Sequence, residues 1–182
     1  MHIEFEAKVL DIDTTAAAEA IVAQGGRRTA DTTLQRRYVY DIVPGDESRW
    51  IRLRDNGSCV TLSVKEIRHD GIDGTDEVEI EVSAFESTND LLKMMGFTAR
   101  SYQENRRTSF ELDGAQLEID AWPMIPPYLE IEAKSREEVV RIAGLLGYTE
   151  AELTGENTVK VYARHGIDLM ALDRISFSDS QS

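Results

Sequence analysis

The first nine residues read M-H-I-E-F-E-A-K-V, from Met1 to Val9, and this pattern is typical of a β-strand with two chemically different faces. Because successive side chains of a strand point to opposite faces, Glu4, Glu6 and Lys8 would share one face and apolar residues the other. Two carboxylates beside a lysine suit a hard cation together with an anionic ligand, since carboxylate oxygens bind Mg²⁺ or Mn²⁺ and an ammonium binds phosphate oxygens. The same alternation also occurs on ordinary solvated sheets, so the remaining strands decide its meaning.

The rest of the chain is dominated by strands that repeat this two-faced pattern. Residues 50–54, W-I-R-L-R, lead through Asp55-Asn56-Gly57 into a partner strand that ends near Glu66, which is the clearest hairpin in the sequence. A second hairpin turns at Asp113-Gly114 between residues 101–112 and 117–122. Further strands are expected over residues 36–41, 76–82 and 128–134, which brings the total to roughly eight.

Three or four short amphipathic helices separate these strands. Each is expected to begin at a residue whose side chain can accept a hydrogen bond from the free amides of the first turn. The expected N-caps are Asp13 or Thr14, then Ser87 or Thr88, then Ser135, which forms a capping box with Glu138, and a last short helix covers residues 157–164.

The polar faces of the strands carry more charge than a solvated sheet needs, and the charges are grouped by strand. A closed antiparallel barrel with these faces inward would enclose a hydrated tunnel, and the amphipathic helices would cover its apolar outer face. We therefore predict an α+β fold in which a β-barrel has a polar lumen. The expected lumen residues are Glu4, Glu6, Glu77, Glu79, Glu81, Glu111, Glu118, Asp120, Glu130 and Glu132, with Lys8, Arg52, Arg54, Lys65 and Arg107.

Such a lumen suits phosphoryl transfer. Clustered carboxylates repel one another and need divalent cations, while arginine and lysine side chains can clamp a polyanion whose oxygens bridge to those cations. Catalysis of phosphoryl transfer depends mainly on positioning and on neutralising charge, so that no catalytic triad or reactive cysteine is required. The candidate clamp residues are Arg52, Arg54, Lys65 and Arg107.

Length and composition indicate one soluble globular domain. With 182 residues, 41% of them hydrophobic and 30% charged, the chain can bury one sizeable core. We expect a single domain over residues 1–175 and a disordered polar tail over residues 176–182. The formal net charge of -14 argues against a nucleic acid or an anionic membrane as the main partner.

Cysteine usage and the N-terminal sequence indicate a reducing compartment. Cys59 is the single cysteine, which excludes a disulfide within the chain. No apolar stretch approaches the length of a membrane span, and the first residues lack the charged and hydrophobic regions of a signal peptide. We therefore expect a cytoplasmic protein.

Six motifs, in order along nearly the whole chain, resemble those of the CYTH domain, the triphosphate tunnel metalloenzymes. The most characteristic is E-x-E-x-K near the N-terminus, and the clearest departure is an asparagine in the later basic motif, which is usually K-x-R. The matching residues are Glu4, Glu6 and Lys8; Arg52 and Arg54 of an R-x-R strand; Lys65; Glu77 and Glu79 of an acidic strand; Asn105 and Arg107; and Asp120, Glu130 and Glu132 of an acidic end.

This resemblance implies an eight-stranded antiparallel tunnel that uses Mg²⁺ or Mn²⁺ to act on a small-molecule triphosphate. It implies two sets of site residues. The metal ligands would be Glu4, Glu6, Asp120, Glu130 and Glu132, and the triphosphate contacts would be Lys8, Arg52, Arg54, Lys65 and Arg107. Glu77 and Glu79 are open between a second metal site and a structural role as partners of the arginines.

Three residues need a separate interpretation. Asn105 stands where the motif usually has a lysine, so that only Arg107 of this motif can bind phosphate. Arg106 is a candidate to assist it, although adjacent residues of a strand face opposite ways. Lys65 has a possible second role beside Glu4 and Glu6 in catalysis. It would orient or deprotonate the attacking water, provided that burial among cations lowers its pKa.

Three functions fit these residues. The favoured one is a metal-dependent triphosphatase that hydrolyses inorganic tripolyphosphate or an organic triphosphate, because a polyanion clamp is what the sequence positively indicates. A class IV adenylyl cyclase, making cyclic AMP and pyrophosphate from ATP, would need a base pocket that no stretch specifies. A non-catalytic polyphosphate-binding module is the third, suggested by Asn105. The preferred triphosphate, the metal and the existence of a homodimer stay open.

Overall fold

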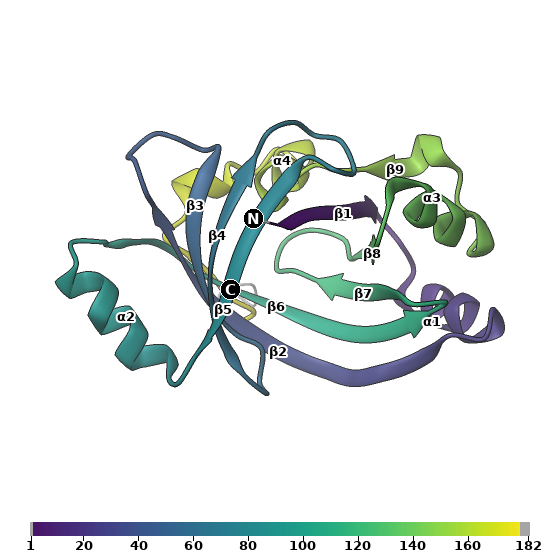
Figure 1. Ribbon diagram of the computed structural model, residues 1–182, viewed down its shortest axis with the longest axis horizontal. Coiled ribbons are helices and arrows are strands. Elements are labelled where there is room, and N and C mark those ends of the chain that lie inside the picture. The colour runs from purple at the N-terminus through teal and green to yellow at the C-terminus, as the bar shows by residue number, and fades with distance from the viewer. Residues whose placement is uncertain (1, 179–182) are drawn as a thin grey trace.

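Eight antiparallel strands close into a barrel in the computed structural model, which describes residues 2–178 (Figure 1). The order around the barrel is β6-β2-β3-β4-β5-β1-β8-β7, and the hairpin between β6 and β7 closes the ring. The predicted eight-stranded antiparallel barrel is therefore confirmed. The strands are β1 (His2–Val9), β2 (Arg27–Asp41), β3 (Arg49–Asp55), β4 (Val60–Ile67), β5 (Thr75–Val82), β6 (Ala99–Leu112), β7 (Ala115–Ala121) and β8 (Tyr128–Ala133), with the short β9 (Leu153–Thr154) on β1 and β10 (Arg174–Ile175) parallel to β6.

The strand register places the charged faces inside the barrel. Lys8 of β1 lies opposite Glu130 of β8, which in turn lies opposite Glu118 of β7. Across the barrel, Lys65 of β4 lies opposite Glu77 of β5. Because directly opposed residues share a face of the sheet, the alternation of each strand adds up to one continuous charged inner surface.

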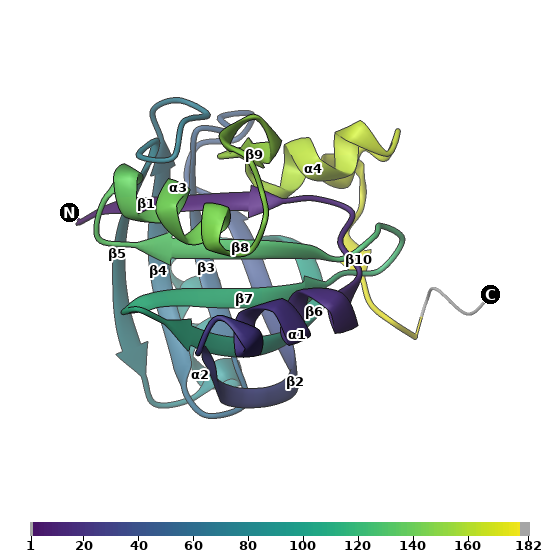
Figure 2. The ribbon, with the colours of Figure 1, turned by 90° about the vertical axis from the view of Figure 1, so that its right-hand side faces the viewer.

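Two helices cover the outer face of β1, β8 and β7. These are α1 (Thr14–Ala23) and α3 (Arg136–Leu145), which lie across these strands in Figure 2. The apolar outward residues of the strands, such as Ala7, Leu117 and Ile131, are fully buried beneath them. This is the main hydrophobic core, and it lies outside the barrel rather than within it.

Two further helices make smaller cores. Helix α2 (Phe85–Met94) packs on the outer face of β2 and β3, where Leu53 is fully buried. Helix α4 (Thr158–Arg164) packs near Trp122 and Tyr128, where β7 passes into β8. Two 3₁₀ turns, Glu150–Glu152 and Leu169–Ala171, flank α4. None of the helices within residues 2–178 has the length and apolar character that a membrane-spanning helix requires.

The helical cover of the barrel is incomplete, which corrects the predicted covering of the whole outer face. On β5 the outward side chains of Val78 and Ile80 are 52% and 57% exposed, and Val64 on β4 is 38% exposed. The alternation of apolar and charged residues in these strands therefore predicts which side chains point outward. It does not predict whether a helix covers them.

Two elements begin earlier than the sequence predicts. Strand β2 starts at Arg27 rather than near residue 36, because its first part pairs with the long β6 although its side chains are exposed. Helix α2 starts at Phe85, with Ala84 at the N-cap. The Thr88 hydroxyl donates a hydrogen bond to the Ala84 carbonyl within the first turn, so it does not cap the helix.

The other three predicted helix starts are correct, and at the last of them the Asn157 side chain accepts from the Lys160 amide at 3.0 Å. The Asp13 carboxylate accepts hydrogen bonds from the amides of Thr15 and Ala16. The Ser135 hydroxyl accepts from the Glu138 amide at 3.2 Å. The Glu138 carboxylate, however, accepts from the amide before the cap, so the reciprocal half of the predicted capping box is shifted by one residue.

The chain remains packed beyond the predicted domain end at residue 175. Ser176 is buried, and the Phe177 ring lies beneath the Arg106 guanidinium at 4.3 Å. The Phe177 amide also donates to the Glu104 carboxylate at 3.2 Å. The packed unit thus includes the first part of the predicted tail, and residues 179–182 of that tail lie outside the described residues.

A pair of matched substitutions tests the one-sided helical cover. Ile131→Ala should destabilise the protein by about 2–5 kcal/mol, because the buried side chain packs beneath α3 and leaves a cavity. Ile80→Ala should change stability by no more than about 0.5 kcal/mol, because its side chain is exposed. Urea denaturation measures both values. Similar losses at the two positions would contradict the uncovered face of β4 and β5.

Candidate active site

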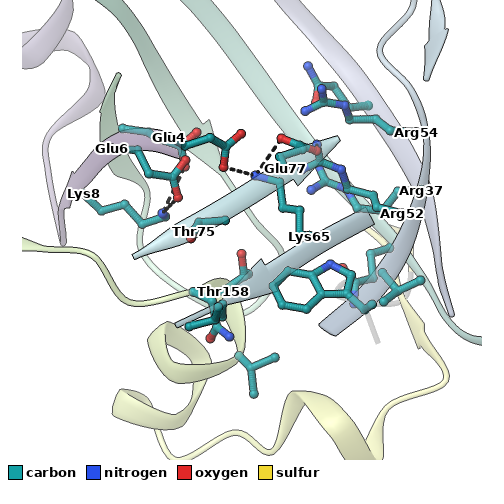
Figure 3. A pocket seen from close by; sticks show the side chains of 18 of the residues that line it. Glu4, Glu6, Lys8, Arg37, Arg52, Arg54, Lys65, Thr75, Glu77 and Thr158 are labelled. Atoms are coloured by element: carbon teal, nitrogen blue, oxygen red, sulfur yellow. Dashed lines mark hydrogen bonds and ion pairs between the residues drawn. The ribbon is translucent and has the colours of Figure 1, made fainter. Parts of the chain in front are cut away.

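The barrel encloses a cavity of about 460 Å³. Its wall is charged on all sides, because each of the eight strands contributes at least one ionisable side chain. In strand order from β1 to β8, these include Glu4, Arg37, Arg52, Lys65, Glu77, Arg107, Glu118 and Glu130. In Figure 3, Arg37, Arg52 and Arg54 lie on one side of the lumen, Glu6 and Lys8 on the other, and Lys65 and Glu77 between them.

A first network of ion pairs runs across β1, β4, β5 and β3. The Lys65 ammonium lies 2.8 Å from the Glu4 carboxylate and 3.2 Å from that of Glu77. Glu77 also binds Arg52 at 2.9 Å. The network ends at Glu79, which lies 3.2 Å from Arg52 and 3.3 Å from Arg54.

A second network occupies the other half of the wall. Lys8 lies 3.1 Å from Glu6 and 3.3 Å from Glu130. Arg107 continues the network with contacts of 3.3 Å to Glu130 and 2.5 Å to Asp120. In both networks, ion pairs within and between nearby strands neutralise most of the charges of the wall.

Glu4 and Glu77 are neighbouring carboxyl groups whose pKa values are shifted in opposite directions. Burial raises the pKa of Glu4 to about 8, and its hydrogen bond to Glu77 acts in the same direction. Burial alone would raise the pKa of Glu77 too, but the hydrogen bond from Glu4 and the charges of Arg52 and Lys65 lower it below its usual range. Glu4 is therefore the protonated partner and Glu77 the ionised one.

One corner of the lumen has an excess of negative charge. Glu132 of β8 lies directly opposite Glu6 of β1. Partial desolvation, together with the charges of Glu130 and Glu6, raises the pKa of Glu132, although the residue as a whole is exposed. Within residues 2–178, Glu132 forms no ion pair within 4.0 Å. Glu132 can therefore accept a cation without losing a lysine or arginine partner, whereas Glu6 would share its contact with Lys8.

The donor chemistry of this corner fits a hard divalent cation, although the site is not preformed. Mg²⁺ and Mn²⁺ take oxygen ligands, and Glu6 and Glu132 offer only carboxylate oxygens. Among the described residues, no three acidic, histidine or cysteine side chains are already arranged to hold a metal ion. Glu4 and Glu130 are nearby but pair with lysines, so they would have to exchange partners to bind a metal.

Several residues lie elsewhere than the sequence predicts. Asp120 lies on the inward face of β7, directly opposite Arg107, but it is fully buried and does not line the cavity; it accepts hydrogen bonds from Arg107 and Asn105 and so anchors these side chains. Arg106 points outward onto Phe177 and cannot help to bind phosphate in the lumen. The predicted lumen residues Glu81 and Glu111 do not line the cavity.

The surroundings of Lys65 also differ from those expected. A role as a base was predicted on the condition that Lys65 is buried among cations. Its nearest charged groups are instead the carboxylates of Glu4 and Glu77. This arrangement suits a lysine that binds an anion, and it does not meet the condition for the predicted second role.

Sequence reasoning missed Arg37. It lies on β2 within the alternating series Gln35, Arg37 and Val39, all of which line the cavity. The alternation was visible in the sequence, but Arg36 and Arg37 are adjacent and nothing in the pattern indicates which of them points inward. The register settles this, because Arg37 lies directly opposite Arg54 of the lumen.

No protein-family model matches the chain, and no curated protein matches it either. Solved structures do. A conserved hypothetical protein from Pyrococcus furiosus superimposes with a TM-score of 0.73 at 21% identity, over 86% of this chain and 98% of the other. A candidate adenylate cyclase from Vibrio parahaemolyticus gives 0.74 at 15% identity, over 89% and 98%.

A third similar structure has a described activity. It is a candidate adenylyl cyclase from Hippeastrum, reported to have a dominant triphosphatase activity, with a TM-score of 0.59 at 18% identity over 93% of this chain and 100% of the other. At such identities the likeness establishes a common fold. The resemblance to CYTH-type proteins that the motifs predict is therefore confirmed at the level of the fold.

The raised pKa of Glu4 predicts how stability depends on pH. Between about pH 5 and pH 8 the folded protein holds a proton on Glu4 that the unfolded chain, with an ordinary pKa of 4.5, has released. Stability in metal-free buffer should therefore fall as the pH rises through this window. Because one pKa unit corresponds to about 1.4 kcal/mol, Glu4→Gln should make the fall clearly shallower in urea denaturation at several pH values. The exposed Glu81→Gln is the control, and an unchanged slope in Glu4→Gln would refute the raised pKa of Glu4.

Proposed function

We propose that this protein is a triphosphatase that hydrolyses a phosphoanhydride bond of a triphosphate substrate inside the barrel, with Mg²⁺ or Mn²⁺. The observation that carries this proposal is that one cavity holds cations on several walls, most of them held in place by carboxylates. The proposed triphosphate contacts are Lys8, Arg52, Arg54, Lys65 and Arg107.

Substrate binding would replace carboxylate partners of the lysine and arginine side chains with phosphate oxygens. The phosphate oxygens of the substrate would take over contacts that the wall carboxylates now make with lysine and arginine. A guanidinium can bind two phosphate oxygens at once and an ammonium acts as a point charge. Because the cations are already fixed by their carboxylate partners, they would need little reorganisation to stabilise charge on the transferred group.

The carboxylates would divide between metal binding and positioning. Glu6 and Glu132 would hold a divalent cation, assisted by Glu4 and Glu130. When bound, such a cation neutralises phosphate oxygens and activates a water molecule for attack. Asp120, directly opposite Arg107 on the neighbouring strand, would keep Arg107 in place through contacts of 2.8 Å to Nε and 2.5 Å to Nη2.

The lining of the cavity suits phosphoryl transfer that depends on positioning and charge neutralisation. Among the described residues that line it there is no histidine or cysteine. Phosphoryl transfer by positioning and charge neutralisation needs neither. The activity reported for the Hippeastrum protein supports the same reaction class, whereas the Vibrio parahaemolyticus protein keeps the cyclase as the alternative to test.

Metal ions should stabilise the folded protein. Mg²⁺ or Mn²⁺ that binds only the folded state increases the free energy of unfolding by about 2.7 kcal/mol at a hundredfold excess over Kd. The melting temperature should rise accordingly. Glu132→Gln should reduce this shift, because it removes a carboxylate from the corner with excess negative charge. Differential scanning calorimetry at constant ionic strength measures both effects. A melting temperature that does not respond to millimolar metal would count against the proposed metal site.

Activity should depend on the cationic wall. We expect phosphate release from tripolyphosphate, ATP or thiamine triphosphate with Mg²⁺ or Mn²⁺. Arg52→Met should lower kcat/KM roughly ten- to hundredfold, because a hydrogen bond to a charged group is worth about 1.5–3 kcal/mol. Glu81→Gln, on the same sheet but outside the cavity, should behave like the wild type. Cyclic AMP and pyrophosphate from ATP would identify a cyclase instead, and binding without any product would identify a binding module.

A further inference from the structure

Arg37 is exceptional among the cations of the lumen. Every other lysine or arginine that lines the cavity forms an ion pair with a carboxylate. Arg37 forms none within the described residues, although its side chain is only 6% exposed. Burial of a cation without a counterion is costly, so the folded protein keeps Arg37 at the expense of stability.

The contacts of Arg37 are all with uncharged groups. Its guanidinium lies over the Trp122 ring at 4.6 Å and donates from Nη2 to the side-chain oxygen of Asn105. The nearest carboxylate behind it, Asp120, accepts from Asn105 at 2.7 Å and is already engaged by Arg107 through both oxygens. An amide thus orients Arg37 and leaves its charge uncompensated.

The cationic neighbours of Arg37 make this side of the lumen strongly positive. Arg37 and Arg54 lie directly opposite each other on β2 and β3, and like charges in that relation repel. The Nε atoms of Arg37, Arg52 and Arg54 are all buried without a hydrogen-bond partner. Burial and the charges of Arg52, Arg54 and Arg107 lower the pKa of Arg37 to about 9. The opposed guanidinium groups and their buried Nε atoms fit the binding of an anion at this position.

We propose that Arg37 and Arg54 form a phosphoryl-binding subsite, in which one phosphate group of the triphosphate lies between the two guanidinium groups. This inference rests on the proposed function and assigns to Arg37 a role in substrate binding. The tetrahedral oxygens of a phosphate can accept from two guanidinium groups at once. Arg37 also restores a positive charge beside Asn105, the position where the resemblance led us to expect a lysine.

The test measures tripolyphosphate binding in EDTA, by titration calorimetry, so that neither metal binding nor turnover contributes. Arg37→Met should weaken binding at least about tenfold. The control is Arg36→Met, because Arg36 is next to Arg37 but points outward and pairs with Asp55 at 3.1 Å; it should bind like the wild type. Arg37→Met combined with Asn105→Lys should recover much of the lost affinity, since it returns a cation to the same place.

The melting temperature separates a binding role from a structural one. Without ligand, Arg37→Met should melt at or above the wild-type temperature, because it removes an uncompensated buried charge. With tripolyphosphate, its melting temperature should rise less than that of the wild type. Wild-type affinity in Arg37→Met, or a marked loss of stability without ligand, would overturn the inference and leave the proposed function standing. Failure of the wild type to bind tripolyphosphate both in EDTA and with Mg²⁺ would overturn both.

Discussion

Closure of the barrel is the constraint on which the rest of the structure depends. Once the charged faces of eight strands are turned inward, their side chains lose most of their water and must be neutralised within the wall. The wall meets this requirement with ion pairs between nearby strands, as Lys65 of β4 shows by contacting Glu77 of β5 and Glu4 of β1. The apolar faces are left outside, where helices bury those of β1, β7 and β8 and part of those of β2 and β3, so the hydrophobic cores lie outside the lumen.

The ion pairing of the lumen is incomplete at two places, which makes one side of the lumen positive and the other negative. Arg37 on β2 is a cation without a counterion, and Glu132 on β8 is a carboxylate without a cation, within the described part of the chain. In the order of strands, β2 lies across the barrel from β1, whose Glu6 faces Glu132. A triphosphate bound with a divalent cation matches this distribution: its phosphate groups are negative where Arg37 is positive, and its cation is positive where Glu132 is negative. The paired residues between them are fixed in advance, which is the condition for electrostatic catalysis.

Much of this fold follows from alternation in the sequence, but its limits are clear at particular residues. Alternation indicates which residues share a strand face, and it correctly predicts the charged lumen. It cannot show which strands become neighbours, so it could not distinguish Arg36 from Arg37 or show that Asp120 is buried against Arg107. It also carries no information on whether a helix lies above a strand, as the exposed Val78 and Ile80 demonstrate. These features depend on register and closure, which are properties of the whole barrel.

The most direct test of this account is a crystal structure with a triphosphate analogue whose bridging oxygens are replaced by nitrogen, together with Mn²⁺ located by its anomalous scattering. The account predicts the analogue inside the barrel, with one phosphate group between Arg37 and Arg54, and manganese on the side of Glu6 and Glu132. Lys65 would then have exchanged at least one carboxylate contact for a phosphate oxygen. An analogue bound on the outer surface, with the ion pairs of the lumen unchanged, would contradict the account.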